Sequence, residues 1–144
     1  MEIGTLLQTY GRVNSLRRAK FAAAFEGLPL TCVQALALHF VVHQSALGEV
    51  YPKDIEKFLT IRGSSVNSLL NFLERDGYIV REATKVDGRY KRIVPTPKAK
   101  ELEEEIARRI NLFVDGMFGK IPPDELENFE RILEMLEQNL LQMA

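Results

Sequence analysis

The chain has 144 residues, of which 46% are hydrophobic, and it carries one cysteine and a formal net charge of −1. This length suits one domain, or one compact unit with an oligomerisation extension. The single cysteine excludes a disulfide framework and is typical of a reducing compartment. No run of about 18 apolar residues exists, so no membrane span is expected. The start of the chain lacks a signal-like apolar block, which predicts a cytoplasmic protein.

The first two predicted helices cover residues 2–26 and 31–46. Gly27-Leu28-Pro29 separates them, and Thr31 is expected to be the N-cap of the second. In the first helix the residues at helical spacing are Ile3, Leu6, Leu7 and Tyr10. In the second helix the spacing predicts a core face of Val33, Leu36, Ala37, Phe40, Val41 and Leu47. Residues 48–51 are expected to form a loop, with room for a short strand.

A short helix, a turn and a second helix are predicted next. Pro52 suits the first turn of the short helix, whose apolar side carries Ile55, Phe58 and Leu59. Residues 60–63 form the turn. Ser64 or Ser65 is expected to cap a helix over 64–76, which Gly77 terminates. Two helices joined by a short glycine-containing turn are typical of a helix-turn-helix.

The helix predicted over 64–76 has two chemically different sides. Its apolar stripe consists of Val66, Leu69, Leu70 and Leu73. Its opposite side carries Ser64, Asn67, Ser68, Asn71 and Arg75. A solvated helix face would ordinarily carry Glu and Lys, whereas short Ser and Asn side chains suit a surface that reads base edges. The sequence therefore favours a recognition helix.

A β-hairpin is predicted after this helix. Residues 78–83 and 91–94 read as its strands, with Asp87-Gly88 in the tip at 85–90 and Pro95 expected to shorten the second strand. A helix-turn-helix followed by a hairpin is a winged helix. Residues 51–100 hold eleven Lys and Arg against six Asp and Glu, a net charge of +5, so the remainder of the chain carries −6. Positive charge concentrated in one segment of an otherwise acidic chain is expected of a DNA-binding protein.

Two further helices are predicted at the end of the chain. Thr96 as N-cap and Pro97 at the first position start a helix that extends to about Phe118. The last helix, about 123–142, spaces apolar residues by alternating steps of three and four: Leu126, Phe129, Leu133, Leu136, Leu140 and Met143. Such a heptad seam needs a partner helix. We expect a two-fold homodimer joined by the first and last helices, and pairing of these helices within one chain is the alternative.

Several of these stretches resemble the MarR family of transcriptional regulators. The matching residues are Leu30-Thr31-Cys32-Val33-Gln34, residues 62–70, residues 73–79 and the hairpin residues 87–93. Val94-Pro95-Thr96-Pro97-Lys98-Ala99 departs from the family's usual Leu-Thr-x-x-Gly. The resemblance implies a mainly α fold with a small β-hairpin wing (α+β), in which a winged helix-turn-helix module at 31–96 has dimerisation helices at 1–26 and 97–144. It also implies a sequence-specific DNA-binding regulator, acting as a repressor on a pseudo-palindromic operator in double-stranded DNA.

The candidate site residues follow from the helix face and the resemblance. The expected major-groove residues are Arg62, Ser64, Ser65, Asn67, Ser68 and Asn71. The expected wing and backbone contacts are Lys85, Asp87, Arg89, Lys91 and Arg92. By resemblance, Arg89 enters the minor groove and Asp87 holds it in position. The resemblance also implies a small aromatic effector, for which the candidate pocket residues are Tyr10, Phe21, Phe40 and Phe113; core packing is the alternative for each.

Other functions have less support in the sequence. His39 and His43 stand four residues apart on one helix, a spacing that can bind metal, but no further ligands stand at a recognisable spacing. Cys32 near a helix N-terminus predicts a lowered thiol pKa and an alternative role in redox sensing. Motifs for catalysis are missing, so no enzyme and no cofactor are expected. A winged helix used only for protein contacts remains an alternative.

Overall fold

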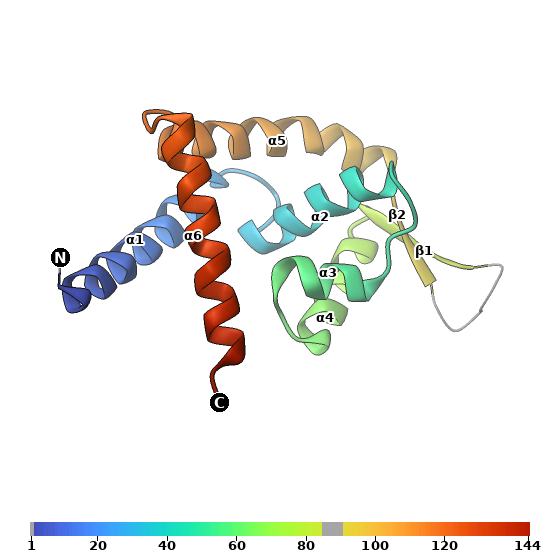
Figure 1. The fold of residues 1–144 in the computed structure, drawn as a ribbon. Helices are drawn as coiled ribbons and strands as arrows, with labels where there is room; N and C mark the ends of the chain where they lie inside the picture. The colour runs from blue at the N-terminus through green and yellow to red at the C-terminus, as the bar shows by residue number, and fades with distance from the viewer. Residues whose placement is uncertain (1, 85–90) are drawn as a thin grey trace. The chain divides into compact units, whose positions relative to one another are not determined.

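The computed structural model describes residues 2–84 and 91–144 (Figure 1). The chain divides into two compact units, Met1–Arg109 and Ile110–Ala144. The predicted fold class, mainly helical with one small hairpin, is confirmed. The elements are α1 (Ile3–Ala24), α2 (Cys32–Ser45), α3 (Pro52–Leu59), α4 (Gly63–Arg75), β1 (Ile79–Ala83), β2 (Lys91–Pro95), α5 (Pro97–Phe118) and α6 (Pro123–Gln142).

The N-terminus of α2 is capped as the sequence predicts. The Thr31 hydroxyl accepts a hydrogen bond from the Gln34 amide (3.3 Å), and the Gln34 side chain accepts one from the Thr31 amide (3.0 Å). This reciprocal pair is a capping box and satisfies two amides that have no partner inside the helix.

The predicted core face of α2 is partly wrong. Val33 and Leu47 are 47% and 82% exposed, respectively. Of the predicted residues, Ala37 and Val41 are buried, and Leu36 and Phe40 are half-buried. Ala35 and Leu38 are buried in addition. Apolar side chains occur around most of this helix, so their spacing alone does not choose the face that packs inward. Leu47 also lies beyond the last helical residue, Ser45.

The helix-turn-helix is formed by α3 and α4, which pack against each other. The first residue of α4 is Gly63 and its N-cap is Arg62, which makes no side-chain capping bond. The expectation that Ser64 or Ser65 caps the helix is therefore wrong, because both lie inside its first turn. Gly77 ends the helix as predicted: it adopts φ 81°, a left-handed conformation that suits glycine.

Two hydrogen bonds close the C-terminus of α4. The Gly77 amide donates to the Glu74 carbonyl (3.1 Å) and the Tyr78 amide to the Leu73 carbonyl (2.8 Å). This is a Schellman motif, which satisfies carbonyls that the helix leaves unpaired. The apolar stripe of α4 is buried as predicted: Val66, Leu69, Leu70 and Leu73. Burying each such side chain stabilises the fold by about 1.5–3 kcal/mol relative to exposure, which holds α4 in one rotational orientation.

The two strands form an antiparallel hairpin whose register runs from Ile79 opposite Pro95 to Ala83 opposite Lys91. The expectation that Pro95 shortens the second strand is wrong, because β2 includes Pro95 as its last residue. Proline is tolerated at the end of an edge strand, where no ladder bond needs its missing amide. Ile93 is buried, and its amide donates to the Val50 carbonyl (2.7 Å). The loop before α3 thus adjoins the hairpin through this bond, although no strand is assigned there.

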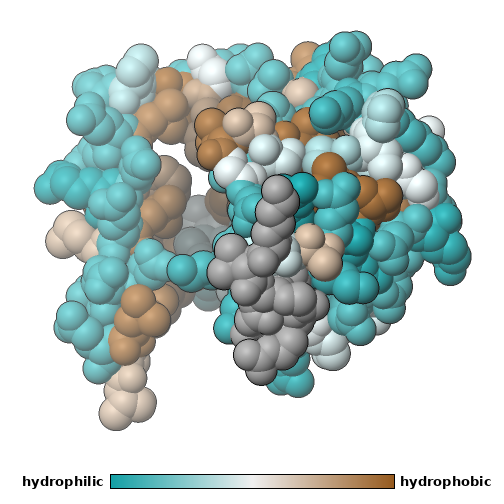
Figure 2. Space-filling view, turned by 90° about the vertical axis from the view of Figure 1, so that its right-hand side faces the viewer, coloured by the Kyte–Doolittle hydropathy of each residue, from teal (hydrophilic) through white to brown (hydrophobic). Residues whose placement is uncertain are grey.

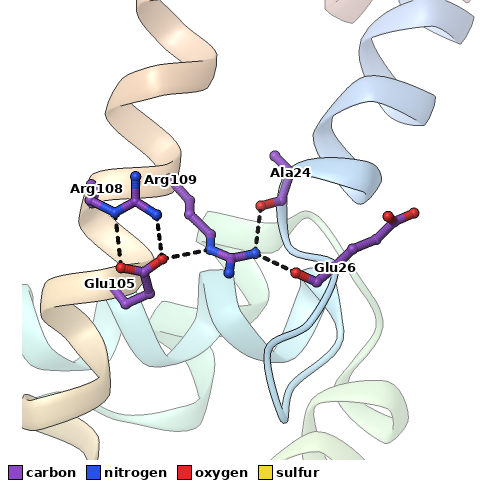
Figure 3. A network of polar contacts seen from close by, with 5 residues as sticks. All are labelled: Ala24, Glu26, Glu105, Arg108 and Arg109. Atoms are coloured by element: carbon purple, nitrogen blue, oxygen red, sulfur yellow. Dashed lines mark hydrogen bonds and ion pairs between the residues drawn. The ribbon is translucent and has the colours of Figure 1, made fainter.

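The predicted N-cap of α5 is confirmed. The Ala99 amide donates to the Thr96 hydroxyl (3.4 Å), and the same hydroxyl donates to the Gly77 carbonyl (2.7 Å). Thr96 therefore joins the start of α5 to the end of α4. Farther along α5, the Arg109 guanidinium donates to the Ala24 and Glu26 carbonyls at the end of α1 and to the Glu105 carboxylate (Figure 3).

Apolar side chains remain exposed in both units. Figure 2 shows such residues, in brown, at the surface seen in that view. On α1 the exposed residues include Ile3, Leu6, Leu7 and Tyr10, and on α6 they include Phe129, Leu133, Leu136 and Leu140. No helix in the described part of the chain is long and apolar enough to cross a membrane. The predicted dimer, and the division into a module at 31–96 and dimerisation helices, stay predictions.

Candidate nucleic-acid interface

The exposed face of α4 carries the predicted polar residues. Ser64, Ser65, Asn67, Ser68 and Asn71 are all exposed, and Arg62 is exposed just before the helix. Because the opposite stripe is buried, this face points away from the core. The Ser68 hydroxyl donates to the Ser64 carbonyl (3.2 Å), one turn back along the helix. The face therefore offers amide and hydroxyl groups of short reach, which can hydrogen-bond with base edges.

Asn71 is held by a residue of the hairpin. The Arg81 guanidinium on β1 donates to the Asn71 side-chain oxygen and to the Glu74 carboxylate (3.1 Å). The bond from Arg81 holds the pKa of the Glu74 carboxyl below its usual range. Asn67, in contrast, makes no side-chain hydrogen bond with the described residues. Of the two asparagines, Asn67 therefore has both its donor and its acceptor exposed for a ligand.

A surface groove lies beside the N-terminal end of α4. It has a volume of about 880 Å³, and its lining residues are Lys53, Asp54, Glu56, Lys57, Thr60, Ile61, Arg62 and Ser65. Lys53, Lys57 and Arg62 are exposed. Cations next to the polar face of α4 are suited to phosphate contacts, which position a protein on DNA without reading sequence.

The wing residues differ in what surrounds them. Lys91 is exposed at the start of β2. Arg92 forms ion pairs with Glu82 (2.8 Å) and Glu49 (3.5 Å), and the bond to Glu82 raises the pKa of its guanidinium. No local pattern in the sequence signals this pairing, which balances the charge of Arg92. Lys85, Asp87 and Arg89 lie outside the described residues.

The four candidate pocket residues lie on three helices, α1, α2 and α5. Tyr10 is 59% exposed on α1, and the Phe21 ring packs edge-on against Phe25 with 5.0 Å between centroids. Phe40 stacks on Phe58 at 4.5 Å. It lines a surface pocket of about 430 Å³ together with Gln44, Glu49, Val50, Asp54, Lys57 and Phe58. Phe113 belongs to the second unit. None of the other three candidates is a lining residue of the Phe40 pocket.

The prediction for Cys32 is wrong in direction. Cys32 is the first residue of α2 and is half-buried. Burial raises the pKa of its thiol, and the nearby Arg17 only partly opposes this shift. Desolvation disfavours the thiolate and outweighs any lowering of the pKa by the helix N-terminus.

The sequence spacing indicates no further ligand beside His39 and His43, and the structure adds one from a distant element. Glu103 of α5 lies against both histidines. Because Glu103 is 60 or more residues away in sequence, no local spacing signals this contact.

The geometry of α3, α4 and the β1–β2 hairpin defines a winged helix-turn-helix. The sequence model of the MarR family matches residues 26–89. Over these residues the chain is similar to the MarR family. A relative, the HTH-type transcriptional regulator YwhA of Bacillus subtilis (strain 168), is 30% identical over 86 residues, which are 60% of this chain and 62% of that protein. The match thus spans less than two thirds of the relative's length.

Two solved structures have the same fold. The S. aureus MepR–DNA complex has a TM-score of 0.80 and 22% identity, with 96% of this chain and 98% of that chain covered. Bordetella bronchiseptica BpsR, whose DNA binding is regulated by 6-hydroxynicotinic acid, has a TM-score of 0.76 and 21% identity, with 94% and 93% covered. The relative YwhA is by name a transcriptional regulator, in agreement with the expectation that the chain is not an enzyme.

Proposed function

We propose that this protein is a DNA-binding transcriptional regulator whose helix α4 enters the major groove. The observation that carries the proposal is the exposed Ser and Asn face of α4, opposite a fully buried stripe. A helix fits the major groove of B-DNA, where each base pair presents a distinct pattern of donors and acceptors. The major-groove residues are Arg62, Ser64, Ser65, Asn67, Ser68 and Asn71.

The chemistry of the face favours DNA over a protein partner. Protein interfaces obtain much of their affinity from buried aromatic anchors, and the residues of the polar face of α4 are serines, asparagines and an arginine that covers the half-buried Phe72 ring. The net charge of +5 over residues 51–100 suits a polyanion. The related fold of MepR, solved as a DNA complex, supports the same choice.

The wing is proposed to contact the minor groove and the flanking phosphates. Arg89 would enter the minor groove, held by Asp87, with Lys85 and Lys91 along the backbone. A narrow minor groove concentrates negative potential, which favours a guanidinium. Arg92 contributes less than the sequence suggests, because it must first leave Glu82 and Glu49 to reach a phosphate.

The protein is proposed to act as a homodimeric repressor on a pseudo-palindromic operator. Two copies of α4 would read two half-sites about one helical turn apart. A small aromatic effector is proposed to relieve repression, supported by the effector-regulated relative BpsR. Its candidate contacts are Tyr10, Phe21, Phe40 and Phe113, of which Phe40 already lines a pocket.

Selection of bound sequences from a random DNA pool tests this function. We expect an enriched inverted repeat with half-site centres about 10–10.5 base pairs apart. Fluorescence anisotropy at two salt concentrations should then give a lower affinity at the higher salt, because binding releases counterions. A scrambled duplex of equal composition is the control. If no sequence is enriched and the selected and scrambled duplexes bind equally, sequence-specific regulation is excluded and the protein-contact alternative is favoured.

A further inference from the structure

A cluster of metal-ligand side chains joins α2 to α5 inside the first unit. The Glu103 Oε1 atom lies 2.9 Å from His43 Nε2 and in direct contact with His39 Nδ1. One ligand atom from each of the three residues lies within 4.8 Å of the other two. His39 and His43 are four residues apart on α2, which places both rings on one helix face.

Glu103 supplies a second, independent observation. Glu103 is only 6% exposed. Among the described residues it is the one charged side chain in the buried core. Both histidines approach the same oxygen, Oε1, whereas Oε2 is buried and has no hydrogen-bond partner among the described residues. Buried polar atoms are nearly always paired, and buried charges are paired or coordinate metals. The unpaired oxygen therefore indicates that the cluster binds something further.

We propose that His39, His43 and Glu103 form a binding site for a zinc-class divalent cation. Two imidazoles and one carboxylate are a donor set that zinc accepts, with a water in the fourth position. Zinc bonds of about 2.0–2.2 Å separate tetrahedral ligands by roughly 3.4 Å. The ligand atoms here lie within 4.8 Å of one another, so side-chain rotations would bring them to that separation. The His43 side chain is 56% exposed and gives the ion and its water access from solvent.

The donor set also limits the choice of ion. Calcium and magnesium prefer ligand sets made of oxygen alone, whereas imidazole nitrogen suits first-row transition metals. Cys32 is not part of the cluster, so the site would contain nitrogen and oxygen ligands without a thiolate. Because one ligand comes from α5 and two come from α2, the bound ion would link these helices and stabilise the folded chain.

Metal titration of the purified, chelator-stripped full-length chain tests the site. We expect one Co²⁺ per chain, with visible absorption of a low-symmetry cobalt site and no thiolate-to-metal band. Zn²⁺ should displace Co²⁺, and Mg²⁺ should not. Competition with a chromophoric chelator then measures the Zn²⁺ affinity. Zn²⁺ should also raise the unfolding temperature of the wild type.

Ligand variants and matched controls distinguish this site from adventitious binding. His43→Gln and Glu103→Gln should each weaken Zn²⁺ binding by roughly tenfold or more. Glu104→Gln changes an exposed carboxylate next to Glu103, and Cys32→Ser removes the thiol; both should bind Zn²⁺ as the wild type does.

His43 is exposed, so its variant is expected to fold, which circular dichroism of the metal-free proteins checks. Equal Zn²⁺ affinity of the wild type and His43→Gln would overturn the proposal. Failure of the wild type to bind one ion per chain would overturn it as well. Neither result depends on DNA binding, so it leaves the proposed regulatory function standing.

Discussion

Asn67 and Asn71 lie one helical turn apart on the exposed face of α4, and the structure gives them different surroundings. Arg81 holds the side-chain oxygen of Asn71, whereas Asn67 has no side-chain partner among the described residues. A bidentate contact with adenine needs both the amide oxygen and the amide nitrogen. At the scale of single residues, the contact from β1 therefore favours Asn67 over Asn71 as a reader of bases.

The first prediction concerns base contacts made by Asn67. Asn67→Ala should cost about 1–3 kcal/mol at the selected operator and flatten discrimination at one base position. The contrasting variant is Lys91→Ala, which should weaken all sites alike and reduce the salt slope by about one unit. Fluorescence anisotropy on single-base operator variants measures both effects. Uniform weakening by Asn67→Ala would show that this side chain does not read bases.

Thr60 carries backbone strain between α3 and α4. It is the one described residue other than glycine with a positive φ, at φ 55° and ψ 46°. The left-handed region is unfavourable for a β-branched residue and costs about 1–2 kcal/mol. Thr60 persists there because it is the C-cap of α3, where the chain must turn toward α4.

The second prediction follows from that strain. Thr60→Gly should raise the free energy of unfolding by about 1 kcal/mol, because glycine adopts positive φ without a side-chain clash. Thr5→Gly is the matched control: Thr5 has helical geometry in α1, so the same substitution should be destabilising, by about 0.3 kcal/mol. Urea unfolding of both variants provides the measurement. A less stable Thr60→Gly protein would contradict the argument.

At the scale of elements, α5 is joined to the end of α1 by a small charge network. Glu105 accepts hydrogen bonds from Arg108 and Arg109, and Arg109 also donates to two carbonyls at the end of α1 (Figure 3). The bonds from Arg108 and then Arg109 lower the pKa of the Glu105 carboxyl from 4.5 to about 2. A cation at a helix C-terminus is also favoured by the helix dipole.

The third prediction is the pH dependence of this network. A lowered carboxyl pKa contributes stability that is fully present above the unfolded value near 4.5 and is lost as the pH falls through about 2. The wild type should therefore be more stable than Glu105→Gln at neutral pH, and the difference should shrink between these two pH values. Urea unfolding across this range tests it, with Glu104→Gln as the exposed neighbouring control. A difference that persists below the lower value would exclude the ionised carboxylate as its source.

The fourth prediction concerns the hairpin wing. If Asp87 orients Arg89, then Asp87→Ala should weaken DNA binding even though it removes a negative charge. Simple electrostatics predicts tighter binding instead. Arg89→Ala should weaken binding most at operators with A·T-rich flanks, where the minor groove is narrow. Fluorescence anisotropy at fixed salt distinguishes the two. Tighter DNA binding by Asp87→Ala would exclude the orienting role of Asp87 and indicate that the wing binds DNA through its positive charge alone.

At the scale of the whole molecule, the exposed apolar residues of α1 and α6 are the main unexplained surface. The α6 residues follow the heptad steps of the sequence, and Leu133 and Leu136 are 40% and 47% exposed. Apolar surface of this kind ordinarily marks an interaction site. A second copy of the chain would cover it and would also place two α4 helices on one DNA duplex.

The fifth prediction tests that dimer. The double variant Leu133→Lys with Leu136→Lys should be monomeric and should lose DNA affinity, because two half-sites read together supply the binding energy. The control pair, Glu134→Lys with Glu137→Lys, adds positive charge to the same helix and keeps the apolar seam, so it should remain dimeric. Sedimentation velocity at micromolar concentration compares them. A wild-type monomer under these conditions would refute the dimer.

Local features of this protein were determined by the sequence itself. The Thr31 capping box, the stop at Gly77 and the buried stripe of α4 each depend on residues within a few positions of one another. Periodicity and capping act over one or two helical turns, so one stretch of sequence contains all the information. The helix bounds of α5 and α6 were predictable for the same reason.

Only the tertiary structure decided which distant groups meet. The Glu103 contact with His39 and His43 and the Arg81 contact with Asn71 join different elements. The buried face of α2 was also undecided, because that helix is apolar on most sides. Burial of Cys32 reversed the pKa shift expected from its helix position. Desolvation and long-range pairing depend on how elements pack together, and no local spacing in the chain encodes that packing.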